Sequence, residues 1–327
     1  MNHYLGIEIG GTKLQLGVGA DDGVLAGLWR GPVDIAAGPE GIRRQITTAV
    51  PELLAKANLD RSQIKGVGIG FGGPVDDRTH HVIKSHQIEG WDDYPLADWV
   101  SDVVGLPAAL GNDADVAGLA EALHGAGKGL SPIFYITIGS GIGGGFIIDG
   151  EIYRGVGRGA AEIGHLQFQT YFLKDSQSAF SSPTKILEEL ASGWGIAETA
   201  KQCIMKEQPI RSVLYARAYD SKRPLTANDV AVAARQGDAF AESILKQALQ
   251  YLADAVCHVI ALLCPRRIVI GGGVSLMGEE LLFAPLRKVV ADNVFKPFAG
   301  LTDIVPAALG EEVVVHGAIA LARKRLR

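Results

Sequence analysis

Three glycine-rich segments are the first candidates for chemistry in this sequence. They are Gly10–Lys13, Gly70–Pro74 and Gly139–Gly145. Glycine reaches positive φ without strain and lets backbone N–H groups approach phosphate oxygens with no side chain in the way. A single short glycine motif is weak evidence, however, because a tight hairpin turn needs the same residues. Each segment alone therefore predicts either a phosphate loop or a plain turn.

The residues that follow these glycines exclude the two commonest nucleotide motifs. Both Gly139–Gly144 and Gly68–Gly73 match the spacing of a dinucleotide-binding fingerprint, which must open a helix. Phe146–Ile148 instead continues as a strand, and Pro74–Asp77 forms a turn. Gly11–Lys13 lacks the longer loop and the helix of a Walker A motif. Hairpin phosphate loops are the prediction that fits.

Asp113 is the candidate for acid–base work. Transfer of a phosphoryl group to a hydroxyl needs phosphate donors, Mg²⁺ and a carboxylate that positions and deprotonates the attacking oxygen. The alternative is a helix cap, because Asn112 and Asp113 precede the apolar helical positions Val116 and Leu119. The two interpretations are compatible, since a cap fixes the carboxylate at a strand-to-helix junction.

Further polar side chains follow the third glycine segment. Glu162 and His165 could bind vicinal sugar hydroxyls as acceptor and donor, although an isolated His or Glu is usually structural or solvated. Glu188 is a weaker candidate, because charge on a helix normally faces solvent. Trp91 is expected to be a core residue.

Hydrophobic periodicity predicts the elements that must position these residues. The chain opens with a pattern typical of two strands joined by a glycine turn, and the same pattern returns near residue 133. Each time, alternating helices and strands follow. The pattern indicates two duplicated α/β lobes around mixed sheets. The expected strands are Tyr4–Ile9, Lys13–Gly19, Lys65–Phe71, Ile133–Ile138, Phe146–Asp149 and Arg267–Ile270. The expected helices cover about 42–53 with Pro51 as a kink or boundary, 96–103, a segment from Asn112, 186–200, 226–236, 240–263 and 311–325.

Composition narrows the class of protein. The length of 327 residues suggests two domains, and a net charge of −5 gives no basic surface for nucleic acid. No apolar run is long enough to cross a membrane, and no basic and apolar leader opens the chain. Three cysteines without metal-ligand spacing favour a reduced compartment. We therefore expect a cytoplasmic protein without membrane or nucleic-acid partners.

The motifs taken in order resemble the ROK family, which contains bacterial sugar kinases and sugar-responsive repressors. The resemblance spans almost the whole chain, and the ordered set is far more specific than any one motif. It is carried by Gly6–Lys13, Gly72–Asp76, Asn112–Ala114, Gly139–Gly145, Glu162–His165 and Ile270–Gly273.

The resemblance implies an α/β, two-lobed, actin-like ATPase (ribonuclease H-like) fold with mixed β-sheets flanked by helices. It implies two lobes: residues 1–115 together with 312–327 form the first, and residues 116–311 form the second. It also implies a homodimer that binds a sugar and ATP with Mg²⁺. Asp113 would be the general base. The sugar would be held by Asn112, Glu162, His165, Glu188 and Gly73. ATP would be bound by Gly10, Gly11, Thr12, Lys13, Thr137, Gly139, Ser140, Gly141 and Gly143, with Gly272 and Gly273 near the base.

Three departures from the family pattern matter. Glu8 stands where related kinases usually have Asp near the metal. Its carboxylate is on a longer side chain, and we expect it to bind Mg²⁺ through water. Gln87 stands where Asn is usual, which puts the sugar preference in doubt. The zinc-binding cysteines are replaced by Ala179, Ser181 and Ile186, so no structural zinc is expected. Packing of aromatic residues would order that segment instead, from Phe168, Tyr171, Phe172 and Phe180.

The function expected from these observations is that of an ATP-dependent, glucokinase-like hexose kinase. One alternative is a repressor, which the acidic charge and the lack of a preceding helix-turn-helix pattern disfavour. Others are a catalytically silent sugar sensor and a kinase that uses polyphosphate as donor. The sequence does not fix the hexose, and glucose is the first expectation.

Overall fold

The computed structural model describes residues 2–20, 22–76, 78–85, 88–157, 159–170, 184–206, 212–220 and 223–326. Contacts divide the chain into two compact units. The first comprises Met1–Tyr135, Gly145–Ala161 and Ala307–Arg327, and the second Ile136–Gly144 and Glu162–Pro306. Residues 116–135 and 145–161 thus group with the first unit, although the expected boundary after residue 115 separates them from it. The division into lobes with separate roles stays a prediction.

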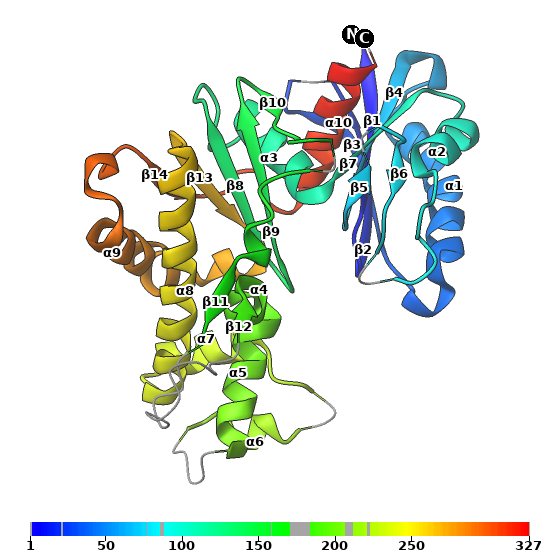
Figure 1. Cartoon of the computed structure of the whole chain (residues 1–327). Coiled ribbons are helices and arrows are strands. Elements are labelled where there is room, and N and C mark those ends of the chain that lie inside the picture. The colour runs from blue at the N-terminus through cyan, green and yellow to red at the C-terminus, as the bar shows by residue number, and fades with distance from the viewer. Residues whose placement is uncertain are drawn as a thin grey trace. The chain divides into compact units, whose positions relative to one another are not determined.

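The first unit is built on a five-stranded sheet in the order β3-β2-β1-β4-β7 (Figure 1). β1 pairs antiparallel with β2 and parallel with β4, and β4 pairs parallel with β7. The expected opening hairpin is confirmed, and the sheet is mixed as predicted. Its strands are β1 His3–Ile9, β2 Lys13–Gly19, β3 Leu25–Pro32, β4 Ile64–Phe71 and β7 Ala108–Asn112.

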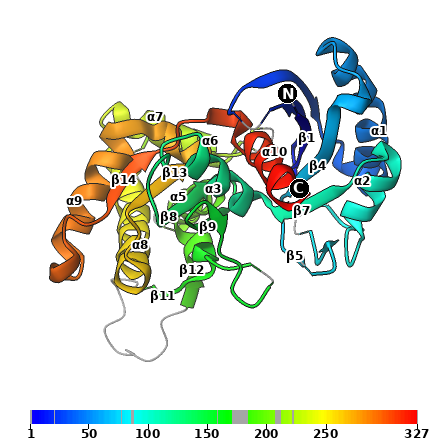
Figure 2. The same ribbon diagram turned by 90° about the horizontal axis from the view of Figure 1, so that it is seen from above.

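Helices cover both faces of this sheet, with α1 and α2 on one side and α3 and α10 on the other (Figure 2). α1 runs through Pro51 and buries the predicted stripe, including Ile42, Ile46 and Leu53. Burying each large apolar side chain contributes about 1.5–3 kcal/mol, which offsets the roughly 3 kcal/mol cost of an internal proline. These helices are α1 Gly38–Lys56, α2 Leu96–Val104, α3 Asp113–Leu123 and α10 Val313–Arg325.

Close packing of α10 on the sheet depends on a strand residue without a side chain. A Cβ at Gly68 of β4 would lie 1.8 Å from the carbonyl oxygen of Ala318 on α10, so only glycine fits. The closing helix therefore returns to the sheet formed by the N-terminal strands, and the two chain ends lie in the same unit.

The second five-stranded sheet has the order β10-β9-β8-β13-β14. The predicted strand–glycine–strand repeat is confirmed, but β9 already begins at Ile142 and so includes Gly143–Gly145. β13 and β14 pair in parallel. The strands are β8 Ile133–Ile138, β9 Ile142–Ile148, β10 Glu151–Ile152, β13 Arg267–Gly271 and β14 Asp303–Pro306.

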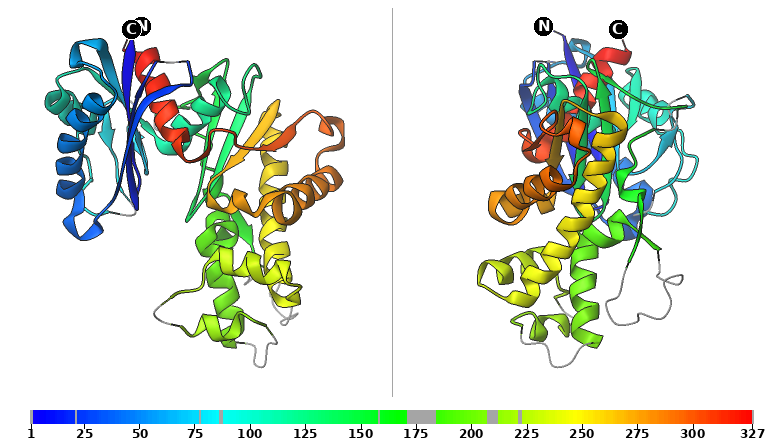
Figure 3. Two further views of the ribbon diagram at one scale, coloured as in Figure 1. Left: turned by 180° about the vertical axis from the view of Figure 1, so that it is seen from behind. Right: turned by 60° about the vertical axis from the view of Figure 1, so that its left-hand side comes forward.

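The helices of the second unit surround the long α8, which packs against α9 (yellow and orange in Figure 3). Asp238 caps α8 through its side chain, and Cys264 ends it in a left-handed conformation just before Pro265. None of the helices in the described ranges is long and apolar enough to cross a membrane. The helices are α4 Leu187–Ala191, α5 Gly193–Lys206, α6 Tyr215–Ala218, α7 Ala227–Arg235, α8 Ala239–Leu263 and α9 Ala284–Asn293.

Short elements complete the two units. The small strands pair as hairpins, β5 with β6 and β11 with β12. They are β5 Val75–Asp76, β6 His81–Val82, β11 Gln167–Gln169 and β12 Thr184–Ile186. The short helices are η1 Ile35–Ala37, η2 Arg61–Gln63, η3 Ile163–His165, η4 Gly273–Met277, η5 Glu279–Phe283, η6 Lys296–Phe298 and η7 Gly310–Glu312.

His316 of α10 is expected to make the first unit sensitive to acid. Burial, and secondarily the neighbouring His124, hold the pKa of His316 below its usual value of 6.5. The unfolded chain therefore binds more protons than the folded one as the pH falls below 6.5. We expect wild type to lose stability between pH 7.5 and 5 by more than His316→Gln does. Urea unfolding of both proteins at the two pH values measures the difference, and equal losses would contradict the assignment.

Candidate active site

Parallel strands bring the first group of predicted residues to one edge of the N-terminal sheet. β1, β4 and β7 end side by side, because Ile9 is paired with Phe71 and Phe71 with Asn112. The N–H of Gly10 donates to the carbonyl oxygen of Lys13 at 3.0 Å and closes the first glycine turn. The N–H of Gly72 donates to the carbonyl oxygen of Ile9 at 2.9 Å. The first two glycine segments and the start of α3 thus form one site.

Asn112 is the residue that caps α3. Its Oδ1 accepts hydrogen bonds from the N–H groups of Ala114 at 2.9 Å and Asp115 at 3.3 Å. Its Nδ2 donates to the carbonyl oxygen of Gly73 at 3.0 Å, which ties the cap to the second glycine segment. The cap that the sequence suggested as the alternative role of Asp113 is therefore provided by Asn112.

Asp113 occupies the first helical position, where the helix dipole favours a negative charge. Its Oδ1 accepts the N–H of Ala114 at 2.8 Å. A Cβ at Gly72 would lie 3.5 Å from Oδ2 of Asp113, so that oxygen faces the second glycine segment. The half-buried carboxylate is thus held at the strand edge beside both glycine turns.

Glu8 lies under the first glycine turn and is held by cross-strand partners. Its Oε2 accepts a hydrogen bond from Gln15 Nε2 at 2.7 Å, and its Oε1 lies 3.4 Å from Lys13 Nζ. Burial raises the pKa of the Glu8 carboxyl, while Lys13 and Gln15 oppose that rise. Lys13 also donates to the carbonyl oxygen of Glu311 at 3.2 Å. Sequence reasoning missed Gln15 as a hydrogen-bond partner of Glu8, although the register of the hairpin places the two residues opposite each other.

In the second unit, Glu188 holds the turn between β8 and β9. Its Oε2 accepts the N–H of Ile142 at 2.8 Å. A Cβ at Gly141 would lie 2.4 Å from the same oxygen, so this turn needs glycine to admit the carboxylate. The N–H of Gly139 donates to the carbonyl oxygen of Gly141 at 2.9 Å and closes the turn. Glu188 is therefore directed toward the backbone of the glycine turn.

A cavity of about 410 Å³ lies beside this turn. The start of α5 forms one wall, where the N–H of Gly193 donates to the carbonyl oxygen of Gly139 at 2.8 Å. Three of the residues predicted to bind ATP line this cavity: Gly139, Ser140 and Gly273. Sequence reasoning missed four residues that also line the cavity: Gly193, Thr226, Asn228 and Arg235. Thr226 and Asp229 form a capping box at the start of α7, which is a local signal that a sequence can carry.

Glu162 and His165 flank the short helix η3, which packs under the same turn. Gly164 between them allows this contact, since a Cβ there would lie 2.1 Å from the carbonyl oxygen of Ile142. Ile163 is buried, whereas both polar side chains are exposed, with His165 Nδ1 3.8 Å from Glu162 Oε2. Glu162, His165 and Glu188 are thus brought to one region of the second unit.

The remaining predicted residues occupy strand ends around the second turn. Thr137 lies on β8 and Gly143 on β9. Gly272 has a φ of +84° and packs against Ile138 at the end of β8. Gln87, Ala179 and Ser181 lie outside the described residues, as do Tyr171, Phe172 and Phe180. Phe168 is described and packs against Tyr251 of α8; that aromatic packing orders the segment stays a prediction.

The structure therefore assembles the predicted residues into two groups, one within each unit. The first holds Glu8, Gly10–Lys13, Gly72, Gly73, Asn112 and Asp113, and the second holds the β8–β9 turn, Glu162, His165, Glu188 and Gly273. Each group combines a tight glycine turn with carboxylates. Backbone N–H groups of such turns suit phosphate, and carboxylates suit hydroxyl groups and metal ions.

Comparison with known proteins places this arrangement in a family. The model of the ROK family matches residues 4–325. The chain is 32% identical to a glucokinase of Halalkalibacterium halodurans, over 96% of this chain and 93% of the relative. It is 30% identical to a glucokinase of Thermotoga maritima, over 98% of both chains. A solved ROK family glucokinase from Streptomyces griseus, in complex with glucose and AMPPNP, superposes with a TM-score of 0.77 at 30% identity and covers 99% of this chain and 100% of its own.

Two five-stranded sheets flanked by helices, each with a glycine turn at a strand end, give the chain the actin-like ATPase fold. The chain belongs to the ROK family. Near-full-length similarity to kinases of that family places it among the sugar kinases.

Proposed function

We propose that this chain is an ATP-dependent hexose kinase in which Asp113 is the general base. The observation that carries the proposal is the position of the Asp113 carboxylate, at the first turn of α3 and beside the glycine turns that follow β1 and β4. Asn112 caps α3, and the Asp113 carboxylate is proposed to bind the substrate hydroxyl and take its proton. The glucokinase relatives and the glucose and AMPPNP complex of one of them support this assignment.

The chemistry assigns separate roles to the two groups of residues. Asp113 orients the acceptor hydroxyl and takes its proton as the oxygen attacks the γ-phosphorus of ATP. The backbone N–H groups of the two glycine turns stabilise charge on the transferring phosphoryl oxygens. The bond from the γ-phosphorus to the bridging oxygen breaks, and ADP leaves with that oxygen.

The sugar is proposed to bind through polar side chains whose positions are set by backbone contacts. Asn112 is held by its hydrogen bond to Gly73, and Glu162 and His165 are carried by the buried η3 turn. Glu188 bonds the β8–β9 turn through Oε2, which leaves Oε1 to accept a sugar hydroxyl. Such acceptors and donors should reject analogues that lack a hydroxyl, because a polar group that the bound sugar shields from water is then left unpaired.

ATP is proposed to occupy the 410 Å³ cavity of the second unit. The start of α5 and the capped start of α7 both border the cavity, and helix N-termini favour negatively charged phosphate groups. Gly273 gives backbone access beside the base. Ser140 lies on the turn that would hold the phosphates.

Glu8, on β1 beside the first glycine turn, fits Mg²⁺, which the proposed reaction requires. Glu8 supplies a hard carboxylate oxygen, and this ion commonly binds one or two carboxylates, several waters and substrate phosphates. No cluster of three or more ligand side chains occurs in the described ranges, so Glu8 would act through water together with ATP. The bound ion would neutralise charge on the phosphates as they transfer.

A coupled assay for ADP release across a panel of hexoses tests the proposal. We expect ATP-dependent turnover with glucose among the accepted sugars. Parallel reactions with polyphosphate identify the phosphoryl donor. Sugar binding by calorimetry without turnover on any hexose, with either donor, would contradict the kinase assignment and support a sugar sensor.

Substitution of Glu188 tests the double role proposed for its carboxylate. Glu188→Ala removes both the acceptor for Ile142 and the sugar ligand, so KM should rise for sugar and for ATP by about tenfold or more each. Glu188→Gln keeps a neutral oxygen for the turn, so the KM for ATP should change less than the KM for sugar. Steady-state kinetics of both variants measure this, with Glu52→Ala on the exposed face of α1 as control. An unchanged KM for sugar in both variants would exclude Glu188 from the sugar site.

A further inference from the structure

A chain of hydrogen bonds connects Glu8 to the residues that precede α10. Its centre is Gln15 of β2, which is 1% exposed. Gln15 Nε2 donates to Glu8 Oε2 at 2.7 Å and to the carbonyl oxygen of Glu311 at 2.9 Å. Gln15 Oε1 accepts the Nε–H of Arg30 at 2.8 Å, and the Arg30 guanidinium also pairs with the Glu312 carboxylate. The proposed chemistry assigns no role to Gln15 or Arg30.

The register of the sheet places these side chains in one row. Glu8 is paired with Gln15 across β1 and β2, and Gln15 with Arg30 across β2 and β3. Directly opposed residues of neighbouring strands point to the same face of a sheet and lie within contact distance. That face is covered by α10, because a Cβ at Gly6, two residues before Glu8, would lie 2.6 Å from the carbonyl oxygen of Val315. Backbone pairing therefore sets the row, and the side-chain bonds join its members.

The partners of the Gln15 amide suit only one of its two orientations. The Nε2 hydrogens face two acceptors, the Glu8 carboxylate and the Glu311 carbonyl oxygen. The guanidinium of Arg30 has only donors, so it requires the amide oxygen on its side. The reversed amide would place its oxygen against two acceptors and its N–H₂ against a donor. Arg30 thus determines that Gln15 presents a donor to Glu8.

A neutral donor holds the Glu8 carboxylate without cancelling its charge. A glutamate side chain has several rotatable bonds, and fixing it in one conformation costs rotamer freedom. The bond from Gln15 restrains Oε2 of Glu8, while Oε1 lies 3.4 Å from Lys13 Nζ. The charge of Arg30 is balanced by Glu312. Carboxylates that hold a metal ion are commonly oriented by hydrogen bonds from such outer partners.

We infer that Gln15 is a positioning residue for Glu8, and that Arg30 sets the orientation of the Gln15 amide for this task. The inference rests on the proposed function, in which Glu8 acts on Mg²⁺ through water. Glu8 is longer than the aspartate usual at its position, and the bond from Gln15 anchors the end of the longer side chain. Glu8 and Gln15 therefore act as a pair toward the magnesium–nucleotide complex.

Binding of AMPPNP, measured by calorimetry with Mg²⁺ and with EDTA, tests the inference without phosphoryl transfer. The ratio of the two Kd values reports what Mg²⁺ contributes to binding. Gln15→Met keeps the length of the side chain and removes its donors, so this ratio should fall about tenfold, whereas Kd in EDTA should stay within about twofold of wild type. Arg30→Met should lower the ratio about threefold, because the Gln15 amide is then no longer oriented from that side.

A double variant shows whether Gln15 acts through Glu8. Glu8→Gln removes the anionic oxygen and should lower the ratio at least as much as Gln15→Met does. Adding Gln15→Met to Glu8→Gln should lower it no further, because the group that Gln15 positions is already lost. A purely structural role of Gln15 would instead give losses that add.

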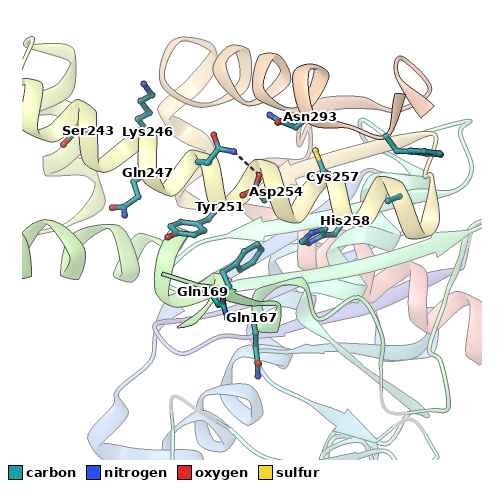
Figure 4. A pocket seen from close by; sticks show the side chains of 14 residues that line it. Gln167, Gln169, Ser243, Lys246, Gln247, Tyr251, Asp254, Cys257, His258 and Asn293 are labelled. Atoms are coloured by element: carbon teal, nitrogen blue, oxygen red, sulfur yellow. Dashed lines mark hydrogen bonds between the residues drawn. The ribbon is translucent and has the colours of Figure 1, made fainter. Parts of the chain in front are cut away.

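Matched controls separate positioning from general damage. Gln250 Nε2 donates to Asp254 Oδ1 at 2.9 Å in the groove along α8, drawn as a dashed line in Figure 4, so Gln250→Met loses the same kind of bond. None of the residues assigned to catalysis, sugar or ATP lines that groove, and both Kd values should match wild type. Ile319→Val loosens the apolar packing of α10 and changes no polar contact, so it should also leave the ratio unchanged.

The outcomes distinguish this inference from the proposed kinase function. An unchanged ratio in Gln15→Met, an equal fall in Ile319→Val, or additive losses in the double variant would each overturn the inference. If Gln15→Met does not fold, an unchanged ratio in Arg30→Met, whose side chain is 48% exposed, would overturn it instead. An unchanged ratio in Glu8→Gln would refute both the role of Glu8 toward Mg²⁺ and the inference. Failure of wild type to phosphorylate any hexose would contradict the kinase assignment alone, since these ratios need no turnover.

Discussion

Replacement of Asp113 by asparagine is expected to lower kcat by about 10²–10⁴, which corresponds to roughly 3–5 kcal/mol of activation free energy. Asparagine has nearly the same shape as aspartate, and its Oδ1 can still accept the N–H of Ala114. It cannot take a proton from the sugar hydroxyl. Steady-state kinetics should show the loss in kcat, and calorimetry should show sugar binding close to that of wild type.

The structure also predicts what this substitution leaves intact. Because Asn112 caps α3, loss of the Asp113 charge should leave the cap in place and remove a favourable interaction with the helix dipole, worth about 0.3–1 kcal/mol. Asp98→Asn makes the same change in the first turn of α2 and serves as the control. A variant of Asp113 that turns over within a few-fold of wild type would show that its carboxylate is structural.

Removal of the Glu121 carboxylate is expected to produce the largest loss of stability, about 3–4 kcal/mol in the free energy of unfolding. Glu121 is fully buried on α3. Its Oε1 accepts the N–H groups of Ala308 and Leu309 at 2.9 Å each, and its Oε2 accepts the N–H of Ala126 at 2.7 Å. Glu121→Ala leaves these donors without their acceptor, at about 1–3 kcal/mol for each donor that water does not reach.

Two further variants sharpen this test. Glu121→Gln keeps one acceptor oxygen but turns an amide N–H₂ toward a backbone donor, so its loss should be smaller than that of Glu121→Ala. Glu52→Ala on the exposed face of α1 controls for the loss of a carboxylate. Urea unfolding followed by circular dichroism measures all three. A loss below 1 kcal/mol for Glu121→Ala would mean that water replaces the carboxylate.

The sequence by itself determined the opening hairpin, several long helices and the class of chemistry, whereas β3, β14 and α9 were not predicted. Periodicity of two and of 3.6 residues is a local property, so the opening hairpin, α1 and α8 follow from which residues are apolar. The glycine segments were recognised as hairpin turns because strand residues follow them. The ordered motifs indicate the family, and the resemblance implies that Asp113 is the general base. Its catalytic role stays a prediction.

Tertiary structure decided which side chains share a task, since such contacts join residues far apart in the chain. Nothing local distinguishes Asn112 from Asp113 as the cap; the bond from Asn112 to Gly73 exists because β4 and β7 end at the same edge. Glu188 reaches Ile142 across 46 positions, and Glu121 reaches Leu309 across 188.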